Sequence, residues 1–197
     1  MAESAHSHDN QPGERKSAPG DLALVQSFVN TLDVENRFEE LDSPGSLRGW
    51  LAEHDLIGER EPVSDADFGE AIALREAIRK LLLANNGSPL DPAAVDTLNG
   101  AARSAEAIVR FDPSGDATLA PARAGFAGAV TRLLAIVHRS MADGTWERFK
   151  ACPHEDGCEW AFYDYSKNRS STWCAMQPCG NRAKARAYRE RRQHAAR

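Results

Sequence analysis

Four cysteines near the C-terminal end constrain this chain more than any other feature of its sequence. They are Cys152, Cys158, Cys174 and Cys179, two close pairs separated by a longer loop. This spacing is typical of a tetrahedral zinc site, because each pair can hold one edge of the metal while the loop lets the pairs face each other. Thiolates are soft ligands and favour zinc over hard cations such as magnesium. The sequence therefore predicts one structural Zn²⁺ held by all four cysteines.

Two other uses of the four cysteines are open at this point. A disulfide framework would use the same residues, but no apolar stretch near the N-terminus has the character of a secretion signal. Four buried free thiols are the other alternative, since free cysteine packs as a small hydrophobic side chain. The paired spacing favours zinc over free thiols, and the lack of a secretion signal favours zinc over disulfides.

Two segments around the cysteines carry a family pattern. They read CEWAFYDYS over residues 158–166 and WCAMQPCGNRAKAR over residues 173–186. Both resemble the CGNR zinc finger, with the cysteines, the Trp-Cys-x-Met and the Asn-Arg-x-Lys-x-Arg in register. The resemblance implies a C-terminal, DNA-binding zinc module of bacterial regulators.

Aromatic residues are expected to pack around this small module. Residues 146–150 and 159–163 are predicted as strands that lead into and out of the first cysteine pair. Because about fifty residues build little core alone, Trp160, Phe162 and Trp173 are expected to pack around the metal rather than stack on bases.

Basic residues are concentrated at the C-terminal end of an acidic chain. From Trp160 onward there are nine Lys/Arg and two Asp/Glu, whereas the rest of the chain has 15 basic and 27 acidic residues. Residues 181–193, rich in Ala, Arg, Glu and Lys, predict a helix that starts at the zinc-held Cys179 and has cations on nearly all sides. Such a helix fits a DNA major groove. The predicted nucleic-acid contacts are Lys167, Arg169, Asn181, Arg182, Lys184, Arg186, Arg189, Arg191 and Arg192.

Three alternatives for the basic segment stay open. Its arginines could complement the acidic body as a solvated tail, they could meet an acidic protein partner, or they could bind RNA.

Helical patterns dominate the rest of the chain. Apolar periodicity and capping signals predict helices over residues 21–33, 44–54, 65–84, 92–102 and 125–141, and a β-hairpin of residues 107–111 and 117–119. Arg75, Glu76, Arg79 and Lys80 are expected mostly on the solvated side of the longest helix. The predicted fold class is α+β: a mostly helical N-terminal domain with a β-hairpin, then a small four-cysteine zinc finger of ββα or treble-clef-like form.

A second resemblance covers this helical part. It is carried by FVNT over residues 28–31, LDSP over 41–44 with Leu47, Trp50 and Leu51, and LREAI over 74–78. These residues resemble the ABATE domain, which is named for stress-induced transcription regulation and is commonly joined to a CGNR finger. The predicted organisation is a disordered leader (1–20), an ABATE-like regulatory domain (21–145) and a CGNR-type zinc finger with a basic C-terminal helix (146–197).

These patterns together predict a cytoplasmic, zinc-dependent DNA-binding regulator. No catalytic motif is found, and a four-thiolate zinc has no open position for water, so an enzyme is not expected. One finger makes few base contacts, which favours a homodimer on two half-sites. The N-terminal domain is expected to sense an unidentified small-molecule ligand or to dimerise. No apolar run approaches the length of a membrane span.

Overall fold

Helices are the main regular secondary structure in the part of the chain that the structure describes, a computed structural model covering residues 15–153, 158–175, 179–181 and 185. Within it there are five α-helices: α1 (Leu22–Val29), α2 (Pro44–Glu53), α3 (Asp65–Asn85), α4 (Pro92–Ser104) and α5 (Gly125–Ala142). The antiparallel pairs are β1 (Leu32–Asp33) with β2 (Phe38–Glu39), β3 (Ala107–Phe111) with β4 (Ala117–Pro121), and β5 (Phe149–Ala151) with β6 (Ala161–Tyr163). The fold is α+β, as predicted.

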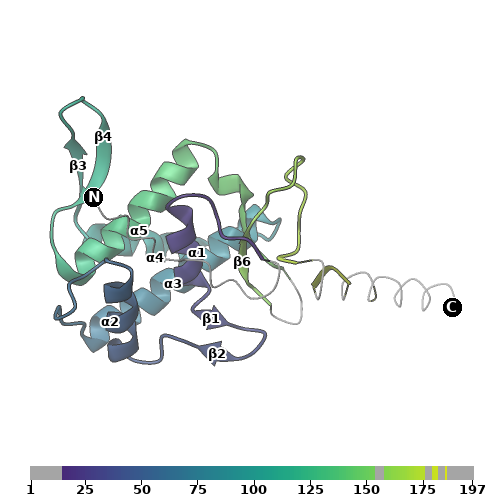
Figure 1. The fold of residues 1–197 in the computed structure, drawn as a ribbon, viewed down its shortest axis with the longest axis horizontal. Coiled ribbons are helices and arrows are strands. Elements are labelled where there is room, and N and C mark those ends of the chain that lie inside the picture. The colour runs from purple at the N-terminus through teal and green to yellow at the C-terminus, as the bar shows by residue number, and fades with distance from the viewer. Residues whose placement is uncertain (1–14, 154–157, 176–178, 182–184, 186–197) are drawn as a thin grey trace, which may run out of the picture.

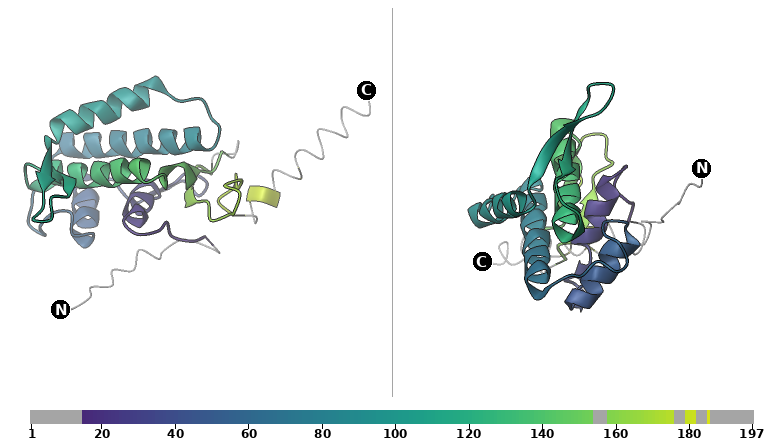
Figure 2. Two further views of the ribbon diagram at one scale, coloured as in Figure 1. Left: turned by 90° about the horizontal axis from the view of Figure 1, so that it is seen from above. Right: turned by 90° about the vertical axis from the view of Figure 1, so that its left-hand side faces the viewer.

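The long helix α3 is the centre of the molecule. It begins at a capping box, in which Ser64 and Asp67 each accept a hydrogen bond from the other's backbone N–H. It lies beside α4 and α5, with α1 and α2 on the other side of the bundle (Figures 1 and 2). Its Leu74, Ile78 and Leu82 are fully buried and form the middle of the apolar core.

Local signals placed most element boundaries correctly. Ser43 caps α2 through a capping box with Ser46, and Pro44 is the first residue of the helix. Helices α3, α4 and α5 and the β3–β4 hairpin lie where the sequence predicts them. The helix expected over 21–33 is too long, because α1 ends at Val29 and the chain then turns into the β1–β2 hairpin.

Two arginines of α3 are buried, which corrects the expectation that they face solvent. Arg75 is 2% exposed and Arg79 is 1% exposed. Arg75 forms two hydrogen bonds of 2.7 Å with the carboxylate of Glu39 and a third with Thr31. The β1–β2 hairpin carries Glu39 onto α3, and this long-range partner makes burial of the guanidinium tolerable.

The last hairpin shares the core of the helical domain. Phe149, Ala151 and Ala161 are fully buried in the same apolar cluster as α1 and α3, and β5 packs directly on α3. The strand expected to start at Trp146 is wrong, since Trp146–Arg148 form the 3-10 turn η1 whose Trp146 ring packs edge-on against Phe149. No helix in the described ranges is long and apolar enough to cross a membrane.

Candidate metal centre

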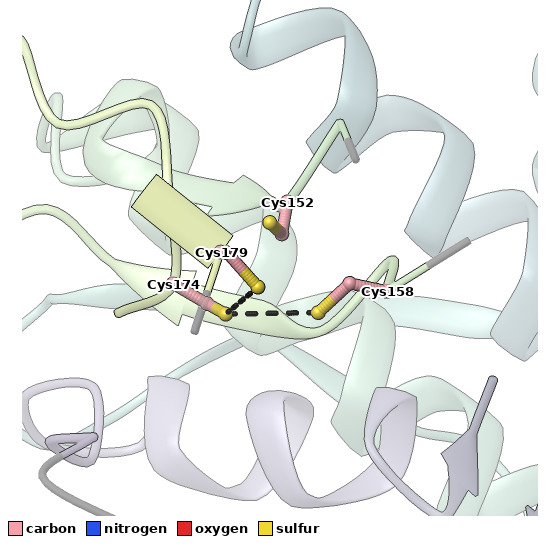
Figure 3. Close-up of side chains that lie close together, drawn as sticks. All are labelled: Cys152, Cys158, Cys174 and Cys179. Carbon is pink, nitrogen blue, oxygen red and sulfur yellow. Dashed lines mark hydrogen bonds between the residues drawn. The ribbon is translucent and has the colours of Figure 1, made fainter. Parts of the chain in front are cut away.

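The four cysteines meet in one cluster at the end of the β5–β6 hairpin (Figure 3). Their sulfur atoms all lie within 4.8 Å of one another. The Sγ atoms of Cys158 and Cys174, and those of Cys174 and Cys179, are 3.7 Å apart. Four sulfurs at the usual 2.3 Å from a zinc ion would be about 3.8 Å apart, whereas a disulfide needs about 2.05 Å. The cysteines are free thiols at the spacing that a single tetrahedral ion requires.

The chemistry of this donor set also fits a divalent cation. Hydrogen bonds from Cys152 and then Cys158 lower the pKa of Cys174 to about 2, and the same contacts with Cys158 and Cys174 raise the pKa of Cys152. Burial raises the pKa of Cys179 to about 12. Ionisation of Cys174 is therefore favoured while ionisation of Cys152 and Cys179 is opposed, and a bound cation is what allows all four to become thiolates.

The metal site is closed. Cys152 and Cys179 are fully buried and Cys158 is 3% exposed, while Cys174 is partly exposed. With four protein ligands, zinc has no vacant position for a substrate or a reactive water. The cluster accordingly fits one structural Zn²⁺.

Backbone geometry at the end of the hairpin positions the first cysteine pair. The Cys152 N–H donates to the carbonyl of Trp160 at 3.0 Å, which continues the β5–β6 pairing up to the ligand. Glu159 has a positive φ of 47°, so the expected strand over 159–163 starts only at Ala161. The Glu159 carbonyl accepts a 2.8 Å hydrogen bond from buried Arg79, which fixes this turn to α3.

A buried ion pair positions the loop that leads to the second cysteine pair. Lys150 of β5 contacts the carboxylate of Asp164 at 2.8 Å and donates to the carbonyls of Arg169 and Ser171. Asp164 also accepts from the Ser171 N–H at 2.9 Å. Burial alone would raise the pKa of Asp164, but hydrogen bonds from Lys150 and Ser166 outweigh it and the pKa is lowered. The Lys150 ammonium therefore uses all three of its N–H donors, one on Asp164 and two on the loop carbonyls.

Polar side chains from the helix ends of the N-terminal part hold the zinc module's backbone. Asn30 at the end of α1 exchanges two hydrogen bonds with Ala161, at 2.8 and 3.0 Å. Asn86 at the end of α3 donates to the carbonyls of Ala151 and Thr172, which lie one and two residues before the ligands Cys152 and Cys174. The sequence marks these asparagines only as helix ends, so nothing local reveals their partners.

The aromatic residues pack as predicted. Trp160 and Phe162 are 6% and 5% exposed and form a second apolar cluster with the cysteines, against which Trp173 packs. The rings replace the core that so short a module lacks.

Only part of the predicted nucleic-acid surface lies in the described residues. Lys167 and Asn181 are exposed, and Asn181 follows two residues after Cys179. Arg169 is exposed and forms a 2.8 Å ion pair with Glu147. The other six residues lie outside the described part of the chain: Arg182, Lys184, Arg186, Arg189, Arg191 and Arg192. The helix expected over 181–193 can be followed only at Asn181 and Ala185, where the backbone is helical.

A helical domain joined to a closed four-cysteine centre defines a two-part zinc-binding protein. Family comparison agrees: the ABATE model, described as a putative stress-induced transcription regulator, matches residues 22–144, and the CGNR zinc finger model matches residues 148–192. The chain therefore belongs to the ABATE family and carries a CGNR zinc finger after that domain. A search of curated proteins found no match.

Proposed function

We propose that this protein is a zinc-dependent transcription regulator that binds DNA through the segment following Cys179. The observation that carries the proposal is the position of Cys179, a fully buried member of the zinc cluster directly before the most basic part of the chain. The metal fixes where this segment leaves the protein. A concentrated positive charge on a fixed anchor favours contact with phosphates.

The charge distribution supports one binding surface rather than several. The chain before Trp160 has 27 acidic residues and 15 basic residues, so it repels a polyanion. The segment from Trp160 onward has the opposite balance, with nine basic residues and two acidic ones. DNA is therefore steered towards the zinc module, with the acidic helical domain turned away from it.

Fluorescence anisotropy of labelled duplex DNA, titrated with zinc-loaded protein at several salt concentrations, tests the proposal. We expect binding that weakens steeply with salt, and we expect Arg182→Ala/Arg186→Ala to reduce the slope of log K against log[salt] by about 2, because each phosphate contact contributes about 0.9. The matched control is Arg60→Ala/Arg103→Ala, which removes two exposed arginines of the helical domain, one before α3 and one in α4. Absence of DNA binding at low salt would contradict the proposal. An equal reduction of the salt slope in the two double variants would also contradict it.

The same titration separates the alternatives. Stronger competition by single-stranded or duplex RNA than by DNA would favour an RNA-binding module. Capture of an acidic protein partner that survives nuclease treatment, with no affinity for either nucleic acid, would favour a protein-interaction module. We propose no catalytic role, and the bacterial origin and cytoplasmic location stay predictions.

We further propose that two copies pair through β3. Val109 and Phe111 on this strand are 60% and 69% exposed, and the hairpin projects from the helices (Figures 1 and 2). The Asp112 N–H donates to the Asp116 carbonyl, so these two residues form a hydrogen-bonded pair. Hydrogen-bonded and non-hydrogen-bonded pairs alternate along an antiparallel ladder, so Val109 and Leu119 form a non-hydrogen-bonded pair. The backbone N–H and C=O of Val109 therefore point to the edge of β3 away from β4. A second β3 can continue the sheet about a two-fold axis with the two Val109 residues opposite each other.

A ligand of the N-terminal domain is proposed to bind between the end of α2 and α5. Two adjoining hollows of about 390 Å³ each lie there, and both are lined by Asp55, Leu56 and Arg132. A small molecule that raises the melting temperature of the wild type, but not of Arg132→Ala, would support this site.

A further inference from the structure

A short segment before α1 crosses the zinc module and is held there by hydrogen bonds (Figure 1). The Tyr165 hydroxyl donates to the Ser17 carbonyl at 2.7 Å. Gln26 of α1, which is fully buried, accepts a 2.6 Å hydrogen bond from the Ala18 N–H and donates to the Lys16 carbonyl. Three consecutive residues, 16–18, are therefore fixed in place, and we call them the N-terminal strap.

The N-terminal strap is part of the folded molecule. Ala18 is 5% exposed and belongs to the apolar core that α1 and α3 form. Gln26 also donates to the carbonyl of Ala161 in β6, so one buried amide joins the strap to the zinc module. The sequence predicted a disordered leader over residues 1–20, which these contacts correct for residues 16–18. Residues 1–14 of that leader lie outside the described part of the chain.

The strap places Lys16 beside an exposed ring of the zinc module. The Lys16 ammonium lies 5.9 Å from the ring centroid of Tyr165, whose exposed fraction is 50%. Lys167 is also exposed and follows Tyr165 by two residues, so the Cα atoms of these two lie within about 7 Å of each other. Two lysines from distant parts of the chain therefore meet at one exposed tyrosine.

Neither lysine has an ion-pair partner within the described part of the chain. Other exposed cations do: Lys80 pairs with Asp91 at 2.6 Å, and Arg169 of the zinc module pairs with Glu147 at 2.8 Å. The described residues thus leave the charges of Lys16 and Lys167 to an external anion. Because the strap backbone is already fixed, less conformational entropy is lost when Lys16 contacts such a partner.

A phosphate backbone is the anion that fits the position of this surface. Arg15, next to the strap, lies over the Trp160 ring at 4.9 Å, and that ring packs in the cluster that includes Cys179. The basic C-terminal segment begins directly after Cys179. The two lysines therefore belong to the same small module as that segment, and an extended polyanion can contact both. Duplex DNA presents regularly spaced phosphates that lysines contact without reading the bases.

We propose that Lys16 and Lys167, brought together at Tyr165 by the N-terminal strap, form a second phosphate-contacting surface for the DNA that the segment after Cys179 binds. This inference rests on the proposed function. It extends the DNA contacts to the strap, which lies outside both matched family ranges, 22–144 and 148–192. Contacts to phosphates position the protein on DNA, so this surface adds affinity and no sequence preference.

Salt-dependent anisotropy of duplex DNA with the full-length, zinc-loaded protein tests this surface. Each phosphate contact contributes about 0.9 to the slope of log K against log[salt], so Lys16→Gln should reduce that slope by about 1 on DNA of any sequence. Lys16→Arg keeps the charge and should retain the wild-type slope. The matched control is Arg60→Gln, because Arg60 is exposed and precedes α3, whose opposite end contacts the zinc module through Asn86. This control should also retain the wild-type slope.

Lysine acetylation supplies a test that needs no variant. With saturating DNA, mass spectrometry should show slower acetylation of Lys16 and Lys167 than in the free zinc-loaded protein. If the wild type binds DNA but Lys16 is acetylated at its free rate and Lys16→Gln keeps the wild-type slope, this surface is overturned and the proposed function stands. An equal reduction of the slope in Arg60→Gln would also overturn the surface, since the effect would then come from general charge. A wild-type protein that binds no duplex DNA would refute the proposed function and this surface with it.

Discussion

Individual buried charged side chains hold the helical domain and the zinc module together. Arg79 reaches the carbonyls of Val29 and Glu159, and Lys150 reaches Asp164 and two further carbonyls. An unpaired charge at any of these positions would be costly. Each is tolerated because its hydrogen-bonding groups are matched by partners that only the folded chain supplies.

At this scale we predict that Asp164→Asn destabilises the zinc-loaded protein by roughly 3–5 kcal/mol, because it leaves the buried Lys150 ammonium without its counter-charge. Urea unfolding measures the loss. The control is Asp96→Asn, which changes an exposed carboxylate of α4 and should leave stability within about 0.5 kcal/mol of the wild type.

The pH dependence of this loss follows from the lowered pKa of Asp164. A carboxyl whose pKa is lower in the folded state stabilises the fold above its unfolded pKa, near 3.9, and this stabilisation disappears as the pH falls through the folded pKa. The difference between Asp164→Asn and the wild type should therefore be the same at pH 8 and pH 6. A difference that shrinks over this range would assign the stabilisation to another group.

The β3–β4 and β5–β6 hairpins have opposite environments. All five residues of β3 are exposed, whereas all three residues of β5 are buried. The β5 strand packs on α3, while β3 pairs with β4 on one side and, among the described residues, with no strand on the other. An unprotected edge strand is a site for pairing with another chain.

At the scale of the element, we predict that Val109→Lys makes the protein monomeric, because the two-fold pairing would place two lysines directly opposite each other. Val109→Glu should have the same effect for the same reason. Light scattering after size exclusion gives the masses. Mixing the two variants should restore a heterodimer through Lys–Glu pairs, and a wild-type protein that is monomeric at all concentrations would rule out the β3 dimer.

At the scale of the whole molecule, the zinc module and the helical domain are joined too closely to unfold independently. Phe149 and Ala161 belong to the core that α1 and α3 form, and Asn30, Arg79 and Asn86 bind backbone groups close to three of the four zinc ligands. Metal binding energy is folding energy in such sites. The metal therefore stabilises the helical domain as well as the finger.

We predict that a strong chelator lowers the melting temperature by at least about 10 °C, since a loss of about 5 kcal/mol shifts a protein of this size by that amount. Far-UV circular dichroism and the fluorescence of core tryptophans should report one shared transition before and after chelation. The variant Cys179→Ala should behave like the chelated wild type. An unchanged melting temperature would contradict the coupling. So would a helical unfolding transition at the same temperature with and without the metal.

The sequence by itself determined the features that depend on near neighbours. Ser43 and Ser64 cap helices through groups three residues away, Pro92 is the first residue of α4, and the spacing of the four cysteines specifies a zinc cluster. Apolar periodicity gave the helical domain because burial on one face repeats with the helix turn. These signals are local, so the sequence displays them directly.

Only the tertiary structure decided what the isolated polar residues do. Arg75 and Arg79 look solvated in a helical pattern, and Asn30 looks like a helix end, but their partners lie far along the chain: Glu39 is 36 residues from Arg75, and Ala161 is 131 residues from Asn30. The same holds for Arg15, whose guanidinium lies over the Trp160 ring of the zinc module. A polar group is buried only where folding brings it a partner, and that partner is set by the packing of helices and hairpins rather than by adjacent residues.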